Sequence, residues 1–320
     1  MFRKTYDDEI LRNIKISNIK ILNTAMQRFI LTLILNIILN VFVLSVHAGD
    51  TWFINTQSTT KPEQFTVKKL NNNSQPSQVW HPATFEEFQE THNPQKPLLI
   101  VVHGNWMSAG KAQNYGYTFD RLLEKIENPN KYRLLIWSWS SERTFCGIRK
   151  DVLAKAQRAD NQANHLLAFL QKLKPNSNVS LIGFSFGARL VCNTLQILAD
   201  TKELNNKLSI RSILLAGALD CGSLNPNGCY NQALSVTEKM LIHVNPNDEA
   251  LCFYPLLVRI GGPQAIGKKG ASLNGLPKEI RQKIKSVNVA QQLGTQHTFI
   301  TSFQTLIAHE KDFRQFALFE

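Results

Sequence analysis

The segment LIGFSFGARL, residues 181–190, begins with the pattern of a buried β-strand and ends with that of a helix. Ser185 stands at the join, flanked by Gly183 and Gly187 in a G-x-S-x-G arrangement. Glycines at these positions let strand and helix pass close together, and the tight turn exposes the serine at the carboxyl end of a sheet. The segment therefore predicts a nucleophilic serine on a strand-to-helix turn. The alternative is an ordinary turn serine between two glycines.

Strand and helix patterns alternate along the rest of the chain. A strand-like stretch at 50–59 and a short helical stretch at 83–92 are followed by apolar strands and helices in turn. This order predicts an α/β fold with a mostly parallel central sheet and helices on both faces. We find no internal repeat and no second core, which predicts one domain over residues 49–320. The further predicted strands are 97–105, 132–140, 178–185, 209–220, 238–248 and 285–297, the further helices are 117–126, 152–173 and 186–199, and 71–78 is a loop.

An apolar run, FILTLILNIILNVFVLSV at residues 29–46, precedes this domain and follows a basic N-terminal stretch. The residues VHA at 46–48 have the small-x-small pattern of a signal-peptide cleavage site. We favour a signal peptide over residues 1–48, cleaved after Ala48, which predicts a secreted or periplasmic protein. The alternative is an uncleaved membrane anchor, because 18 residues just reach the span of a bilayer. Met26 could also be the true start.

Composition and charge narrow the class of protein. Of the 320 residues, 43% are hydrophobic and the formal net charge is +12, which falls to +9 without residues 1–48. This charge predicts association with a membrane or another anionic surface, and no pattern of a nucleic-acid-binding module accompanies it. Five cysteines give an odd count, in which Cys192 has the position of a buried thiol while Cys221 and Cys229 could close a loop disulfide. No cysteine or histidine spacing indicates a metal site.

A nucleophilic serine needs a histidine base and a carboxylate that orients the base. On a strand-to-helix turn of this kind the chain order is Ser, acid, His. Asp248 ends the predicted strand at 238–248, just after Pro246, and His297 ends the run at 285–297. We therefore expect Ser185, Asp248 and His297 to form the triad. Asp220 also ends a predicted strand and is the alternative acid.

Other histidines have less suitable positions. His243 lies within a predicted strand and is expected in the core, His309 lies in a helical stretch, and His103 precedes a glycine, where a role in bracing the loop fits better. The oxyanion of a tetrahedral intermediate needs two N–H donors. We expect them from the backbone of Phe186, after the serine, and of Asn105, in the loop that follows the predicted strand at 97–105.

Seven motifs occur in an order that resembles an uncharacterised family of secreted bacterial α/β-hydrolases, over about residues 50–318. They are IVVHGNW, WSWSSER, KAQRAD, LIGFSFGAR, LLAGALD, HVNPNDEAL and LGTQH. The chain is also similar, more distantly, to α/β-hydrolases grouped as a domain of unknown function with HGYN and HSMG motifs. The resemblance implies an α/β-hydrolase fold with Ser185 as nucleophile, Asp248 as acid and His297 as base. Ser140 stands where such proteins often have proline, which affects loop shape and not the triad.

These residues predict a serine hydrolase that acts on a carboxylic ester, small-molecule or lipid, through an acyl-enzyme on Ser185, without a metal or an organic cofactor. An acyltransferase with the same triad is an alternative, and so is a catalytically silent domain that binds a partner. Phe253, Tyr254, Leu256 and Leu257 could line an acyl pocket, although we favour the hydrophobic core for this cluster. The sequence does not define the acyl chain or the alcohol.

Overall fold

The computed structural model describes residues 50–59, 61–71, 80–201, 208–258 and 261–320. The signal peptide or anchor expected at residues 1–48, its apolar run and most of the loop expected at 71–78 lie outside the described residues. Within the described ranges, no helix combines the length and the apolar character needed to span a bilayer.

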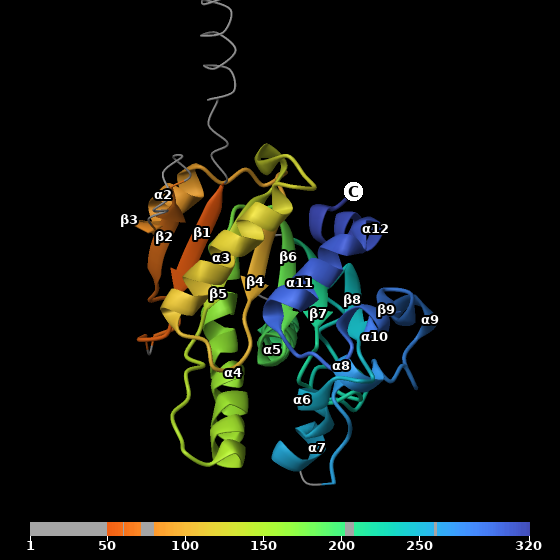
Figure 1. Ribbon diagram of the computed structural model, residues 1–320. Helices are drawn as coiled ribbons and strands as arrows, with labels where there is room; N and C mark the ends of the chain where they lie inside the picture. Colours follow the sequence, from red (N-terminus) through yellow and green to blue (C-terminus); the bar gives the residue numbers. More distant parts are fainter. Residues whose placement is uncertain (1–49, 60, 72–79, 202–207, 259–260) are drawn as a thin grey trace, which may run out of the picture. The chain divides into compact units, whose positions relative to one another are not determined.

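A nine-stranded sheet, counted over the described residues, lies at the centre of the fold (Figure 1). Its strand order is β3-β2-β1-β5-β4-β6-β7-β8-β9. The seven strands from β1 to β9 in this order run parallel, and β2 and β3 are added antiparallel at one edge. The predicted mostly parallel sheet is thus confirmed. The strands are β1 (Thr51–Asn55), β2 (Thr66–Leu70), β3 (Trp80–Ala83), β4 (Leu98–Val102), β5 (Arg133–Ser138), β6 (Asn178–Phe184), β7 (Ser209–Leu215), β8 (Lys239–Val244) and β9 (Ile284–Asn288).

Helices cover both faces of the sheet, as predicted. On one face α3 and α11 pack together, and the rings of Phe119 and Phe303 stack with centroids 4.0 Å apart. Helix α5 packs on β4, β6 and β7, and α4 packs along α5. The helices are α2 (Phe85–Glu90), α3 (Ala109–Leu123), α4 (Ile148–Gln171), α5 (Phe186–Thr201), α6 (Glu249–Cys252), α7 (Tyr254–Leu257), α8 (Ile266–Lys269), α9 (Lys278–Arg281), α10 (Ala290–Leu293), α11 (Phe299–Ala308) and α12 (Glu310–Phe313).

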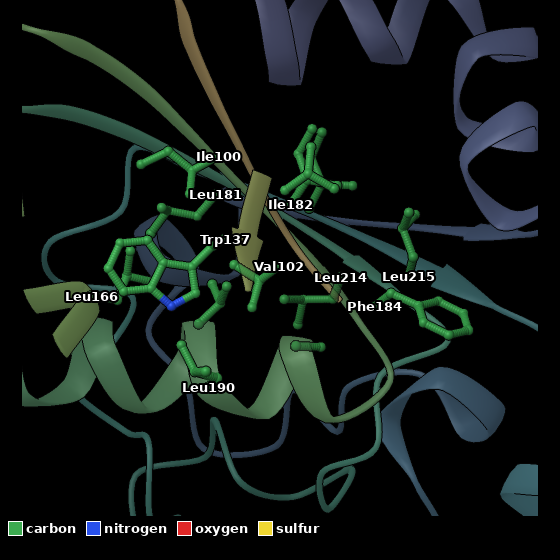
Figure 2. Packing of buried hydrophobic residues seen from close by; sticks show 14 of the residues in the cluster. Ile100, Val102, Trp137, Leu166, Leu181, Ile182, Phe184, Leu190, Leu214 and Leu215 are labelled. Atoms are coloured by element: carbon green, nitrogen blue, oxygen red, sulfur yellow. The ribbon is translucent and has the colours of Figure 1, made fainter. Parts of the chain in front are cut away.

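The core lies on both sides of the central strands. Successive residues of a strand point to opposite faces, so Leu181 and Ile182 of β6 contribute to different layers (Figure 2). On the side of α5, Trp137 of β5 lies near Leu166 of α4 and Leu190 of α5 (Figure 2). All five side chains are fully buried. Burial on both faces explains why these strands have continuous apolar runs instead of alternating patterns.

Several elements differ from the sequence-based expectation. Strands β2 and β3 were not predicted, and α3 spans residues 109–123 instead of 117–126. Helix α4 begins at Ile148, four residues before the predicted start. The stretch 285–297 is not one strand, because β9 ends at Asn288 and the short helix α10 follows it.

The loop that contains Cys221 and Cys229 is not closed by a disulfide, because all five cysteines are free thiols. Backbone hydrogen bonds close it instead, among them one from Tyr230 N–H to Ser223 O at 2.8 Å. Cys192 is fully buried, as expected, and burial raises the pKa of its thiol.

Three glycines permit the close packing around the turn between β6 and α5. A Cβ atom on Gly187 would lie 2.3 Å from the carbonyl oxygen of Val102, and one on Gly183 would lie 2.6 Å from Cα of Ala188. A Cβ on Gly104, in the loop after β4, would lie 2.9 Å from Cβ of Ser185. Helix α5 therefore crosses β4 at a distance that no larger residue allows.

The Gly187→Ala variant should be destabilised, because the added methyl group meets backbone atoms that cannot move aside. We expect a loss of about 1–3 kcal/mol or more in the free energy of unfolding, as in other overpacked sites. For a domain of this size, each kcal/mol lowers Tm by roughly 2–4 °C. Gly110→Ala in α3 is the matched control, since nothing lies within 4 Å of its added Cβ. Equal Tm values for the two variants would contradict the packing argument.

Candidate active site

Ser185 occupies a strained turn at the carboxyl end of β6. Its φ angle is +53°, in the left-handed region that a serine rarely adopts. Three backbone hydrogen bonds hold it there: its N–H donates to Leu215 O at 2.9 Å, and its carbonyl accepts from the N–H groups of Ala188 (3.0 Å) and Ala218 (3.1 Å). The neighbouring strand β7 and the loop after it therefore fix the orientation of the serine.

The structure brings Ser185, His297 and Asp248 into one chain of hydrogen bonds. The Ser185 Oγ atom lies 3.0 Å from Nε2 of His297, and Nδ1 of His297 lies 2.7 Å from Oδ2 of Asp248. The second carboxylate oxygen, Oδ1, accepts from the Leu251 N–H at 2.9 Å and caps α6. Asp248 is fully buried. Because both of its oxygens are engaged, the carboxylate has a fixed direction toward the imidazole.

His297 lies in a loop that is tied to the loop of Asp248. The side-chain amide of Asn245 donates to Gly294 O at 2.9 Å, and Glu249 N–H donates to Thr295 O at 3.2 Å. The imidazole also packs on the ring of Phe184, with centroids 5.0 Å apart. The histidine thus lies after α10 and not at the end of a strand, but these contacts place it at the same edge of the sheet.

Two backbone N–H groups are available beside the serine. Asn105 and Phe186 line the same cavity as Ser185 and His297. Among the described residues, neither N–H donates to a backbone carbonyl, whereas the next N–H in the loop, that of Trp106, donates to Ser141 O at 2.8 Å. Free donors next to a nucleophile can bind the negative oxygen of a tetrahedral intermediate.

His103 braces the loop that carries Asn105. Its Nδ1–H donates to Gly104 O at 2.9 Å, and its Nε2 accepts from the Trp139 N–H at 3.2 Å. Complete burial lowers the pKa of His103 to about 4, so the ring is neutral at neutral pH and can accept at one nitrogen while donating at the other. This arrangement agrees with the bracing role expected from the sequence.

A cavity of about 270 Å³ opens beside Ser185. Ten of its lining side chains are apolar or aromatic, and among the described lining residues none carries a carboxylate, an ammonium or a guanidinium group. The volume is near the lower end of the roughly 300–1,000 Å³ of most ligand pockets. Its lining residues are Asn105, Trp106, Val152, Phe184, Ser185, Phe186, Ala218, Ala250, Leu251, Tyr254, Leu257, Val258 and His297.

Asp220, the alternative acid, has a different contact. Its Oδ1 accepts a hydrogen bond from the Tyr254 hydroxyl at 2.9 Å, which fixes one wall of the cavity. Burial and the nearby Asp220 carboxylate raise the pKa of the Tyr254 phenol, so it stays protonated and donates. In the described chain, the acid that contacts His297 is Asp248.

The expectation of a core position for Phe253, Tyr254, Leu256 and Leu257 was wrong for two of these four residues. Tyr254 is buried and Leu257 partly buried, and both line the cavity. Phe253 and Leu256 are more than half exposed. The reason is that α6 and α7 are short helices at the cavity wall, and no other described helix or strand covers their outer faces. His243, by contrast, is buried as expected.

A buried cluster of charged side chains holds Trp106 in place. No sequence motif indicated this cluster. The indole N–H of Trp106 donates to Oδ2 of Asp151 at 2.8 Å, while Oδ1 accepts from the N–H groups of Thr144 (2.8 Å) and Phe145 (3.0 Å). Lys155 lies 3.3 Å from the same carboxylate, and both charged side chains are fully buried. Burial raises the pKa of Asp151, but these hydrogen bonds outweigh burial and lower it below its ordinary value.

The cluster matters for the site because Trp106 follows Asn105 directly. Trp106 has a φ angle of +56°, which its backbone contact with Ser141 and its indole contact with Asp151 maintain. The sequence contained one signal, an acid and a base four residues apart on a helix. That spacing is normally an exposed pair, and so it did not indicate burial.

Two comparisons with known proteins bear on this site. A family model described as "Alpha/beta hydrolase of unknown function (DUF900)" matches residues 82–259, which is more than half of the chain. The matched residues include Ser185 and Asp248, and His297 lies beyond them. A search of curated proteins found no match.

Asp151→Asn should destabilise the protein, because it leaves the Lys155 ammonium buried without its counter-charge. Breaking one partner of a buried pair typically costs about 3–5 kcal/mol. The double variant Asp151→Asn/Lys155→Met should regain most of this loss, since no buried charge remains. Urea unfolding of Asp151→Asn and of the double variant, each compared with the wild type, measures the difference. If the double variant were no more stable than Asp151→Asn, the ion pair would not be the source of the loss.

Proposed function

Because the chain belongs to the alpha/beta hydrolases of unknown function (DUF900), we propose that it is a serine hydrolase that cleaves a carboxylic ester through an acyl-enzyme on Ser185. The observation that supports this proposal is the hydrogen-bonded chain from Ser185 through His297 to Asp248. A serine hydroxyl is a weak nucleophile unless an adjacent base accepts its proton. The strained turn at Ser185 and the apolar cavity beside it add to this support.

In the proposed acylation step, Ser185 Oγ attacks the ester carbonyl carbon while Nε2 of His297 takes the hydroxyl proton. The carbonyl oxygen becomes an oxyanion and accepts hydrogen bonds from the N–H groups of Asn105 and Phe186. When the tetrahedral intermediate collapses, the bond from carbon to the alcohol oxygen breaks. The imidazolium gives its proton to that oxygen, and the alcohol leaves. Asp248 holds the tautomer and stabilises the imidazolium through Nδ1.

Deacylation repeats these steps with water. His297 removes a proton from the water, whose oxygen attacks the acyl carbon, and the second oxyanion uses the same two N–H donors. Collapse then breaks the bond between the acyl carbon and Ser185 Oγ, and His297 returns the proton to Oγ. The products are a carboxylic acid and the free enzyme. An acceptor alcohol in place of water would make the same site an acyltransferase.

The cavity supports an uncharged, apolar acyl group as the substrate part that enters it. Its described lining residues offer aliphatic and aromatic contacts, and none of these residues supplies a cation for a second carboxylate. The Tyr254 side chain, which the hydrogen bond to Asp220 fixes, forms part of one wall. Aliphatic esters should therefore be better substrates than half-esters of dicarboxylic acids.

A fluorophosphonate probe should label Ser185, because only a serine with an activated hydroxyl attacks phosphorus at a useful rate. Mass spectrometry of the digested protein locates the adduct, and Ser185→Ala should give none. With p-nitrophenyl esters of increasing acyl length, Ser185→Ala should lower kcat by roughly 10⁴–10⁶. A folded protein without any label would favour the silent binding domain over the hydrolase.

The two candidate acids provide a matched pair for the same assay. Asp248→Asn should lower kcat by roughly 10⁴, as expected when the histidine loses the carboxylate that sets its tautomer. Asp220→Asn should act mainly on KM, since Asp220 contacts the cavity wall and not His297. A larger loss of kcat in Asp220→Asn than in Asp248→Asn would reverse the assignment.

We also propose export, on the strength of the apolar run at 29–46 and the VHA site that follows it. When the full chain is expressed in a bacterium with a secretory pathway, the exported protein should begin at Gly49. Intact mass of the periplasmic or secreted fraction measures this. A protein that retains residues 1–48 and sediments with membranes would indicate the uncleaved anchor.

A further inference from the structure

Most of the large apolar side chains that are exposed in the described chain surround the mouth of one cavity. Five such side chains have at least 38% of their surface accessible. Tyr117, on α3, is the fifth and least exposed. The other four, which we call the apolar rim, are Trp106 (46%), Ile148 (53%), Phe253 (56%) and Leu256 (57%).

One side of the apolar rim is formed by the loop after β4 and the start of α4. Trp106 lines the cavity, and its indole N–H bonds to Asp151, three residues beyond Ile148. Val152, one turn after Ile148 on α4, also lines the cavity. Trp106 and Ile148 therefore border the same opening.

The other side of the apolar rim is formed by α6 and α7. From Phe253, which lies between the two helices, to Leu257 at the end of α7, the exposed residues Phe253 and Leu256 alternate with the cavity-lining residues Tyr254 and Leu257. Helix α7 contacts α4. In Figure 1 the start of α4 and helices α6 and α7 lie together at the lower end of the view. The four exposed side chains thus form the border of one opening, and clustered apolar exposure of this kind marks a binding surface.

Three cations stand beside Ile148. Arg143, Arg149 and Lys150 are exposed, and within the described ranges none of them pairs with a carboxylate. Lys150 lies over the Phe145 ring, 4.7 Å from its centroid. Arg149 and Lys150 occupy the first turn of α4, where the helix dipole disfavours positive charge. Arg143 donates to the carbonyl oxygens of Phe145 and Cys146. No described carboxylate neutralises the three charges, and an anionic surface would do so.

We propose that the apolar rim docks onto an anionic lipid surface, with Arg143, Arg149 and Lys150 at the headgroups. Exposed aromatic and aliphatic side chains next to unpaired cations match the boundary of headgroups and acyl chains, where both groups find a favourable partner. The cavity mouth then opens toward the lipid layer, and the acyl ester enters from it. The substrate part of this inference rests on the proposed hydrolase function, but the docking itself does not involve Ser185.

The test measures binding to vesicles by flotation, with a chain that begins at residue 49. Residues 48–71 and 75–320 form one compact unit that contains every described element, so this chain retains the whole fold. Vesicles made of equal parts phosphatidylglycerol and phosphatidylcholine should bind the protein, and pure phosphatidylcholine vesicles should bind it far more weakly. Each cation near an anionic surface contributes a factor of roughly five in affinity. Arg149→Gln/Lys150→Gln should therefore lower binding to the anionic vesicles by roughly 25-fold.

The apolar part of the inference has a matched control. Phe253→Ser/Leu256→Ser should reduce binding at least tenfold, while Tyr117→Ser, which removes an exposed aromatic ring outside the rim, should leave it within twofold. All variants act on side chains that are exposed, and circular dichroism checks their folding. Equal binding by the rim variant and the Tyr117 variant would overturn the proposal.

Tryptophan fluorescence provides a second readout, which identifies the surface that contacts the lipid even in variants that still bind vesicles. Among the described residues, Trp106 is the one exposed tryptophan. Brominated lipids should therefore quench part of the fluorescence of the bound protein, and Trp106→Phe should abolish this effect. Bound protein without quenching would show another surface at the membrane and overturn the proposal. The proposal would also be overturned if analytical ultracentrifugation showed a dimer that dissociates only in Phe253→Ser/Leu256→Ser. The apolar rim would then bind a second copy of the chain.

Failure of the hydrolase proposal would look different. Ser185→Ala should bind vesicles like the wild type while losing esterase activity. Vesicle binding without Ser185 labelling would retain the docking surface and remove the hydrolase. Labelling of Ser185 without vesicle binding would retain the hydrolase and remove the docking surface. Soluble esters would then be the substrates to test.

Discussion

The left-handed backbone at Ser185 is the constraint around which the site is arranged. A non-glycine residue in this region costs of order 1–3 kcal/mol, so it persists only where the surroundings enforce it. Here β6 and α5 meet at the turn, and the hydrogen bonds to Leu215, Ala188 and Ala218 hold both of its peptide groups. The missing side chain at Gly187 lets the helix lie against Val102 O. The same packing that stabilises the central sheet thus presents the hydroxyl at its edge.

The central strands could be predicted from sequence because burial on both faces requires continuous apolar runs. Strands β2 and β3 could not, since they are short, lie at an edge and include Lys68, Lys69 and Pro82, so they lack such a run. The start of α4 was also missed, because Gly147 provides no side-chain cap and two cations follow Ile148. These local features disfavour a helix start at this position. The helix begins there because of contacts with residues that are distant in the sequence.

The three triad positions could be proposed from chain order, but their geometry could not. His297 reaches Asp248 because Asn245 and Glu249 hold the loop that follows α10, and no pattern in residues 285–297 encodes those contacts. The brace between Trp106 and Asp151 joins residues 45 positions apart, which places it beyond any motif. Spacing along a chain identifies groups that can meet at one edge of a sheet, whereas the walls and donors around them depend on tertiary contacts.

Three buried or partly buried carboxylates each fix a different segment at the edge of the sheet where Ser185 lies. Asp248 caps α6 and directs His297, Asp220 holds Tyr254 in the cavity wall, and Asp151 holds Trp106 beside Asn105. Each one ties a loop or a short helix to the site, so the polar groups that would meet a substrate are fixed before it arrives. Such fixed donors stabilise developing charge without the cost of reorganisation. The exposed apolar residues lie on these same tied segments, and therefore a surface that binds the rim also meets the cavity in a defined orientation.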